Sequence, residues 1–317
     1  MRIVFMGTPE YAVQSLAALV EAGHDVVGVI TQPDRPKGRG GKVQAPPAKL
    51  YAQAQGIPVY QPRRIREDGV DDLRALQPDL CVTAAFGQIL SQEILDIPRL
   101  GTLNVHASLL PRYRGSAPIN WCLIHGEKVT GVTIMMTDRG IDTGDMLMQR
   151  ELAILPGETA GELTVRLGAL GAQLLVEAIS ALQAGTLTAT PQDEARMSYH
   201  PMLRKEMGAV DWTLPAETIV NLMRGLNPWP AAYTDSSQGR LKLLSGSAEM
   251  GRSAPPGTVL EADGKAGLLV AAGQGAVRVH TLQAQGGKAM AARDYLRGHP
   301  MPQGEMLFTK ESQGGQA

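Results

Sequence analysis

Length, composition and charge set the first limits on this chain. It has 317 residues, of which 44% are hydrophobic and 19% charged, and its formal net charge is -1. This length allows a large buried core and two domains, and the composition argues against intrinsic disorder. Because the net charge is close to zero, the field of the whole molecule cannot drive binding to a polyanion. Any nucleic acid would have to bind a local basic patch.

The lack of a recognisable targeting segment and the setting of the cysteines predict a soluble, cytoplasmic protein. The apolar N-terminus reaches Gly7 too soon for a signal-peptide core, and no later apolar run approaches the ~20 residues that span a bilayer. Cys81 lies in the apolar run 80–85, which predicts a buried thiol in a reducing compartment. We find no paired-cysteine motif and no histidine pair at helical spacing. We therefore expect no metal. We also expect no membrane partner and a monomer.

The first 185 residues alternate between strand and helix patterns. Residues 3–6 form a short apolar run, apolar residues recur at helical spacing over 11–20, and residues 26–30 form a second apolar run. This is the β-α-β pattern of a parallel sheet. It continues with predicted strands at 57–60, 80–85, 101–106, 131–136 and 146–154 and predicted helices at 68–76 and 158–182. We predict an α/β fold with a doubly wound, mostly parallel, Rossmann-like sheet in a domain of residues 1–185.

The remaining residues have a different pattern. Residues 186–208 are polar and without strong periodicity, which predicts a linker. A helix is expected at 216–224, followed by short strands near 232–234, 241–244, 257–261, 267–271 and 277–282, separated by glycine-rich breaks. Short strands at this spacing favour a small β-barrel in residues 209–317, and a five-stranded barrel of the oligonucleotide-binding (OB) type is one candidate.

Two polar residues share one face of a predicted strand. Asn104 and His106 are two positions apart, so their side chains leave the strand on the same side. They stand at its carboxyl end, where open α/β sheets bind their ligands. The alternative is a buried pair whose polar atoms are satisfied by the backbone. The two interpretations are about equally well supported by the residues alone.

The glycine-punctuated segment 138–145 holds three acidic residues between two predicted strands. Acids in such loops usually bond nearby backbone amides, and we expect that role for Asp138 and Asp145. Asp142 has a functional alternative, since its carboxylate could orient His106 and stabilise the charged ring. Spacing alone does not decide between them.

The loop 31–42 carries four cations, Arg35, Lys37, Arg39 and Lys42, opposed only by Asp34. It is either a solvated loop or a flexible arm that binds phosphates, at the same sheet edge as Asn104 and His106. Gly7 lacks the second and third glycines of a dinucleotide fingerprint, so NAD binding is not expected.

Four segments resemble the folate-dependent formyltransferases. They are Asn104-Val-His-Ala-Ser-Leu-Leu-Pro111, Tyr113-Arg-Gly-Ser-Ala-Pro-Ile119, Gly131-Val-Thr-Ile134 and Asp142-Thr-Gly-Asp-Met146. The resemblance implies that the catalytic residues are Asn104, His106 and Asp142. It also implies a co-substrate, 10-formyltetrahydrofolate, held by Phe86, Gly87, Gln88, Ile89, Leu90, Ser108, Leu109, Leu110 and Pro111.

Within this family, two further segments resemble the members that act on methionyl-initiator-tRNA. These are the basic loop, whose Arg35, Lys37, Arg39 and Lys42 would contact the tRNA, and Leu226-Asn-Pro-Trp-Pro230. The resemblance thus implies a role in translation initiation. Three alternatives stay open: formylation of a small amine, hydrolysis of formyltetrahydrofolate, and a non-catalytic RNA-binding protein.

Overall fold

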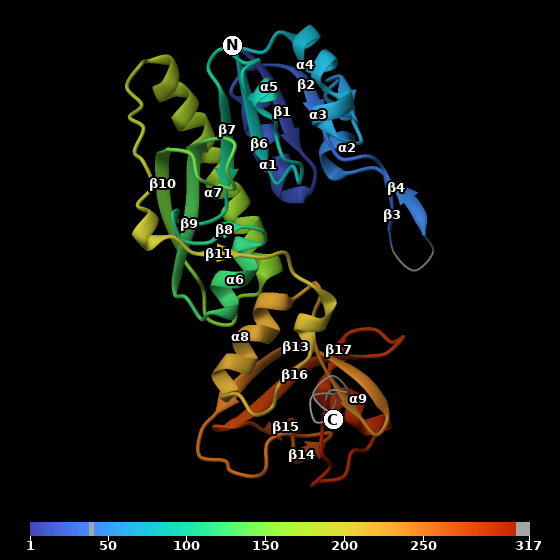
Figure 1. Ribbon diagram of the computed structural model, residues 1–317. Coiled ribbons are helices and arrows are strands. Elements are labelled where there is room, and N and C mark those ends of the chain that lie inside the picture. Colours follow the sequence, from blue (N-terminus) through green and yellow to red (C-terminus); the bar gives the residue numbers. More distant parts are fainter. Residues whose placement is uncertain (38–40, 309–317) are drawn as a thin grey trace. The chain divides into compact units, whose positions relative to one another are not determined.

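The computed structural model describes residues 1–37 and 41–308, which divide into two compact units (Figure 1). Unit 1 consists of Met1–Gly115, Val129–Ala153 and Thr164–His200. Unit 2 consists of Ser116–Lys128, Ile154–Leu163 and the chain from Pro201 onward. Each unit has its own sheet and its own buried core.

Unit 1 is built on a sheet with seven strands among the described residues, in the order β10-β9-β7-β6-β1-β2-β5. The strands are β1 (Arg2–Gly7), β2 (Asp25–Ile30), β5 (Val59–Tyr60), β6 (Leu80–Ala84), β7 (Thr102–His106), β9 (Val129–Met136) and β10 (Met146–Ala153). The first five run parallel to one another, whereas β9 is antiparallel to both of its neighbours, β7 and β10. The predicted mostly parallel sheet is confirmed.

Helices cover both faces of this sheet, as a doubly wound fold requires. On one face, Val4, Met6 and Cys81 belong to a buried cluster with side chains from the short helices α3 (Ile65–Asp68), α4 (Val70–Leu76) and α5 (Gln92–Leu95). On the other face lie α1 (Glu10–Glu21) and α7 (Ala160–Gln183). The Tyr11 hydroxyl of α1 donates a hydrogen bond to the Val105 carbonyl (3.4 Å). Both cysteines, Cys81 and Cys122, are buried thiols, as predicted for Cys81.

Helix α7 is the long helix expected at 158–182. Its length and composition would let it cross a membrane, but one side of it belongs to the protein core, with Leu167, Leu174 and Ile179 fully buried. Its exposed side is more polar, although it includes Val165, and Glu177 on that side forms an ion pair with Arg150 of β10 (2.7 Å). A buried apolar side opposite a more polar one is typical of a helix that packs on a core.

The chain after β2 forms an antiparallel hairpin that stands away from the sheet (Figure 1). Its strands are β3 (Arg35–Lys37) and β4 (Lys42–Gln44), and helix α2 (Pro47–Ala54) follows. We expected a loop here from the sequence. The hairpin escapes prediction because it is too short and too polar to show alternation of apolar residues.

Unit 2 consists of a small barrel and its covering helices. Its antiparallel sheet has the order β12-β13-β16-β15-β14, and β17 pairs with β16. The elements are α6 (Pro118–Ile124), α8 (Ala216–Leu226), β12 (Ala232–Ser236), β13 (Gly239–Glu249), β14 (Val259–Asp263), β15 (Gly267–Ala271), β16 (Ala276–Ala284), β17 (Met290–Ala291) and α9 (Ala292–Gly298). Residues 305–308 join its two edges, because Phe308 exchanges backbone hydrogen bonds with Asp235 of β12 and Glu305 accepts one from Val259 of β14. The sheet thereby closes into the predicted barrel.

Candidate active site

The candidate site lies where four parallel strands of unit 1 end. Strands β1, β2, β6 and β7 have their carboxyl ends at the same edge of the sheet. Asn104 and His106 lie in the carboxyl-terminal part of β7, and the segments after β2 and β6 begin at the same edge. This is the edge at which open α/β sheets place their ligands.

The Asn104 amide is oriented by a neighbour on β6. The Thr83 hydroxyl donates a hydrogen bond to Asn104 Oδ1 (2.9 Å), which leaves the amide nitrogen to point the other way. Asn104 Nδ2 lies 3.5 Å from Asp142 Oδ1. Because this nitrogen carries two N–H groups, one can face the carboxylate while the second can bind an oxygen of a ligand.

His106 is buried, with 6% of its side chain exposed, and its two ring nitrogens have different surroundings. Nε2 lies 3.0 Å from the Tyr113 carbonyl oxygen, which can only accept, so Nε2 carries a hydrogen. Nδ1 lies 3.6 Å from Asp142 Oδ1. A proton taken up during a reaction would therefore go to Nδ1, next to the carboxylate.

Asp142 reaches the site from the loop between β9 and β10. Its carboxylate is 17% exposed, and Oδ2 accepts a hydrogen bond from the Gly115 backbone N–H (2.8 Å). Gly144 allows the tight return of this loop, since a Cβ there would collide with the Met136 carbonyl. Asp138 plays the expected turn-forming role, as its carboxylate accepts hydrogen bonds from Gly140 N and Thr143 Oγ1. The structure thus brings Asn104, His106 and Asp142 together.

The expected folate residues after β6 have mixed surroundings. Phe86 and Leu90 are buried in the cluster under α3–α5, and the Gln88 amide bonds Ile65 N (2.7 Å) and Pro62 O (3.3 Å). Ile89 is 67% exposed, and Gly87 has a positive φ of 77°. A ligand at this segment would therefore contact its backbone and Ile89. The side chains of Phe86, Gln88 and Leu90 instead hold the segment against the rest of unit 1.

The expected folate residues after β7 form a closely supported turn. Ser108 is buried and donates a hydrogen bond to the Arg112 carbonyl (2.8 Å), and the peptide bond between Leu110 and Pro111 is cis. Thr133 of β9 joins this turn to the sheet, since its hydroxyl donates to Ser108 O (2.7 Å) and accepts from Leu110 N (3.1 Å). Leu109 is partly exposed.

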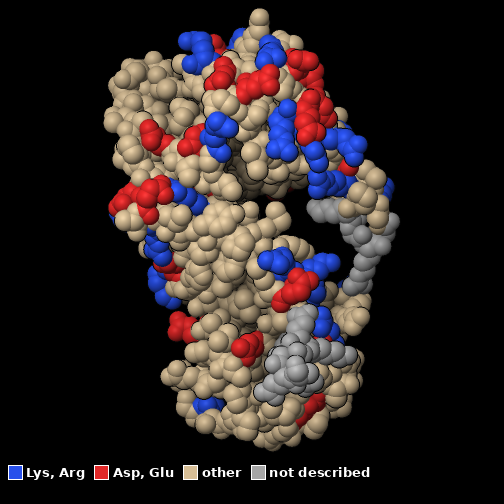
Figure 2. All heavy atoms as spheres, viewed as in Figure 1, with Lys and Arg blue, Asp and Glu red and all other residues tan. Residues whose placement is uncertain are grey.

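The cations of the basic loop are distributed over the β3–β4 hairpin. Arg35 and Lys42 are exposed, Lys37 belongs to β3, and Arg39 lies outside the described residues. Figure 2 shows Lys and Arg side chains gathered around the base of the hairpin. Asp34 does not oppose them, because its carboxylate is held by Lys49 Nζ (2.9 Å) and by the Gln61 amide (2.8 Å).

Gln32 connects this hairpin to the segment after β6. Its Oε1 accepts a hydrogen bond from Arg35 Nη2 (3.0 Å), and its Nε2 donates to the carbonyls of Phe86 (3.2 Å) and Gly87 (3.3 Å). The base of the hairpin and the expected folate segment therefore share one amide side chain.

Three residues at the site were not singled out from the sequence. Thr83 orients Asn104, the Gly115 N–H holds the Asp142 carboxylate, and Gln192 donates from Nε2 to the carbonyls of Asp142 and Gly144 (both 2.8 Å). Thr83 had a local clue, since it lies in a strand expected beside residues 101–106. The other two act across 27 and 50 residues of sequence, which no local pattern reveals.

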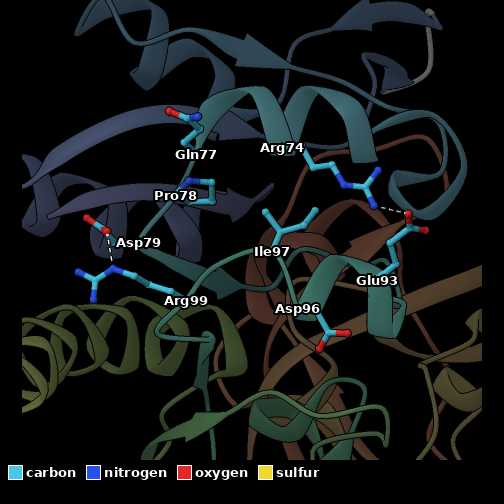
Figure 3. Close-up of a pocket in the computed structure, with 8 residues that line it drawn as sticks. All are labelled: Arg74, Gln77, Pro78, Asp79, Glu93, Asp96, Ile97 and Arg99. Carbon is cyan, nitrogen blue, oxygen red and sulfur yellow. Dashed lines mark hydrogen bonds and ion pairs between the residues drawn. The ribbon is translucent and has the colours of Figure 1, made fainter.

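A surface hollow at the opposite edge of the sheet is a different feature. Residues before β6 and β7 line it, and Figure 3 shows that its arginines face acidic side chains. Arg74 bonds Glu93 (2.6 Å) and Arg99 bonds Asp79 (2.9 Å). The Arg2 backbone N–H and Arg99 together keep the pKa of Asp79 below its usual range. In each pair the acid neutralises the arginine. The hollow is also remote from Asn104 and His106.

Comparison with known proteins identifies the family. Residues 1–179 match the family described as formyl transferase, and residues 202–300 match its C-terminal domain. The chain belongs to the formyl transferase family. A methionyl-tRNA formyltransferase of Geobacter metallireducens is 51% identical over 301 residues, covering 94% of this chain and 96% of the relative. One from Trichlorobacter lovleyi is 49% identical over 311 residues, covering 98% of each.

Solved structures show the same fold at lower identity. HypX from Aquifex aeolicus, crystallised with tetrahydrofolic acid, has a TM-score of 0.66 and 17% identity, covering 98% of this chain and 51% of HypX. WlaRD, a sugar 3N-formyl transferase crystallised with 5-N-formyl-THF, has a TM-score of 0.66 and 18% identity, covering 88% and 97%. Within residues 1–37 and 41–308, no group of three or more His, Cys, Asp or Glu side chains is arranged to hold a metal ion.

Proposed function

We propose that this protein transfers the formyl group of 10-formyltetrahydrofolate to the α-amino group of methionine esterified to initiator tRNA. The observation that carries this proposal is the identity of 51% and 49%, over nearly the full length, to proteins named methionyl-tRNA formyltransferase. The cluster of Asn104, His106 and Asp142 at the ligand edge of the sheet supports it, because the reaction needs such groups.

The chemistry follows from the charges that the reaction creates. The amine nitrogen attacks the formyl carbon, a new C–N bond forms, and the carbonyl electrons move onto oxygen. Asn104 Nδ2 and His106 Nδ1, once protonated, donate hydrogen bonds to this oxyanion. Removing one donor of this kind typically costs about 100- to 1000-fold in rate.

Proton transfer completes the reaction. The attacking amine must lose a proton, and the folate nitrogen gains one as its bond to the formyl carbon breaks. Asp142 orients His106, stabilises its charged form at 3.6 Å, and relays protons through water. Phe86, Gly87, Gln88, Ile89, Leu90, Ser108, Leu109, Leu110 and Pro111 surround the folate in this proposal, mainly through backbone groups and Ile89.

The tRNA substrate requires a second contact area. In this proposal Arg35, Lys37, Arg39 and Lys42 bind phosphates of the acceptor end, residues 1–185 carry the chemistry, and the barrel domain of residues 209–317 contributes to tRNA binding across a linker of residues 186–208. The protein acts as a monomer in the cytoplasm, without a membrane partner. Two buried cysteine thiols suit a reducing compartment.

The test is transfer of labelled formyl from 10-formyltetrahydrofolate to charged initiator tRNA, with elongator methionyl-tRNA and a small amine as parallel acceptors. The proposal expects rapid labelling of the initiator species and little of the others. Equal labelling of both tRNAs would contradict the specificity, and formate release without any acceptor would indicate a hydrolase instead.

A further inference from the structure

Gln192 links Arg114 to the loop that carries Asp142. Both the nitrogen and the oxygen of its amide group take part in this link. Nε2 donates to the carbonyls of Asp142 and Gly144, both at 2.8 Å, and Oε1 accepts from Arg114 Nε at 3.0 Å. A flipped amide would set its oxygen against two carbonyl oxygens and its NH₂ against a guanidinium. The three contacts therefore fix one orientation of the side chain.

The backbone at Asp142 needs such support. Its φ is 54°, a left-handed conformation that is strained for a residue with a side chain and persists only where the surroundings hold it. Gln192 binds the carbonyl of this same residue and that of Gly144 two positions later. It thus holds the strained turn from which the carboxylate reaches Asn104 and His106.

The other end of the connection is also fixed. The Arg114 side chain is buried, with 3% exposed, and its two terminal nitrogens bond the Glu194 carboxylate at 3.1 and 2.6 Å. Arg114 belongs to β8 (Arg114–Gly115), which pairs with β11 (Tyr199–His200). The residues on either side complete the site, since Tyr113 O accepts from His106 Nε2 and Gly115 N donates to Asp142 Oδ2.

We propose that Gln192 is a positioning residue for formyl transfer, because its two amide donors hold the Asp142 turn at the distance from His106 that the reaction needs. This inference rests on the proposed function and on the role of Asp142 in it. Gln192 does not contact the carboxylate or the reacting atoms, so it acts through the placement of Asp142.

One substitution distinguishes two roles of Gln192: holding the Asp142 turn, and anchoring its own segment to Arg114. Gln192→Glu keeps the size of the side chain and its contact with Arg114, but it replaces the donating NH₂ with an oxygen that faces two carbonyls. We expect kcat to fall about 10- to 100-fold, because small displacements of a catalytic group have effects of this size. The KM values for folate and tRNA should change less than about 3-fold, since neither substrate contacts Gln192.

The neighbouring substitution Asp193→Asn is the matched control. It exchanges an acid for an amide on an exposed side chain in the same segment, and it should leave kcat within about 2-fold. If Gln192→Glu fails to fold, Gln192→Met takes its place, because it removes the same two donors without adding a charge, although it also removes the oxygen that accepts from Arg114 Nε. A normal kcat in the folded variant would overturn the inference.

A double-mutant cycle tests whether Gln192 acts through Asp142. In the Asp142→Asn background, Gln192→Glu should cost less than about 3-fold further, because the group it positions is already lost. A full additional loss would overturn the positioning role. If the wild-type protein transfers no formyl to methionyl-initiator-tRNA, the proposed function fails. If the wild type is active and Gln192→Glu equals it, only this inference fails.

Discussion

At the scale of single residues, one hydroxyl group decides how the Asn104 amide faces the site. Thr83 Oγ1 lies 2.9 Å from Asn104 Oδ1 and 3.2 Å from the Leu103 carbonyl, and its hydrogen can satisfy the nearer acceptor. Without this donor the amide could turn its oxygen toward the carboxylate of Asp142. That would remove the donor that we propose for the oxyanion.

We therefore predict that Thr83→Val, which keeps the shape of the side chain, lowers the single-turnover rate of formyl transfer. The loss should be about 3- to 10-fold, the value of one hydrogen bond of ordinary strength. Thr83→Ser keeps the hydroxyl and should retain most of the rate. Equal rates in the valine variant and the wild type would mean that Asn104 is oriented by other contacts.

Part of this site could be predicted from the sequence, and the rest depends on how distant segments pack together. The two-residue spacing of Asn104 and His106 predicted their common face, and both side chains do reach Asp142 Oδ1. The distance of Asp142 from them depends on how β9 and β10 turn back beside β7, which spacing does not encode. Gln192 lay in a polar segment without periodicity, so nothing local marked it.

At the scale of elements, the close approach of α7 to the sheet depends on Gly171. A Cβ at this position would lie 2.8 Å from Val105 Cγ1, on a β-branched side chain that cannot swing away. Gly168 of the same helix is different, because a Cβ there would meet only the end of the flexible Gln14 side chain at 2.5 Å.

These two glycines form a matched pair for a stability test. Gly171→Ala should be less stable than Gly168→Ala by about 1–3 kcal/mol, the usual cost of overpacking a core, measured by urea denaturation. Both substitutions gain the same helix propensity, so the difference isolates the contact with Val105. If the two variants were equally stable, α7 would not pack against β7 as closely as described.

The cations of the β3–β4 hairpin should matter for binding of tRNA. Arg35→Gln combined with Lys42→Gln should weaken binding of initiator tRNA and reduce the salt dependence of log K by about 1 per cation removed, while folate binding stays unchanged. Arg74→Gln with Arg99→Gln, at the hollow on the opposite edge of the sheet, removes the same charge and serves as control. An unchanged salt slope in the hairpin variant would refute its role.

Elements with a clear apolar pattern were predictable, including the seven-residue α4 within the helix expected at 68–76, whereas some other short elements were not. The strands of the parallel sheet and the helices α7 and α8 were expected because apolar residues recur over enough residues to define a period. Helix α6 has seven residues and follows Ala117, whose φ is 59°, and α2 has eight residues. In neither does the apolar pattern stand out from a loop.

At the scale of the whole molecule, the order of the elements predicted both the doubly wound sheet and the closed barrel. The assignment of segments to the two compact units was harder to predict from the sequence. Ser116–Lys128 and Ile154–Leu163 belong to unit 2 although they lie between segments of unit 1. Residues 190–200 belong to unit 1, where they bond to Met146, Arg114 and the Asp142 loop. Such contacts depend on packing between distant segments rather than on local composition.

In the proposed function, Asn104, His106 and Asp142 carry formyl transfer to methionyl-initiator-tRNA. The decisive measurement is the single-turnover rate of labelled formyl transfer by purified, folded Asn104→Ala and Asp142→Ala variants at saturating substrates. We expect each variant to lose about 100- to 1000-fold relative to the wild type while still binding folate and tRNA. Near-normal rates in either variant would contradict it.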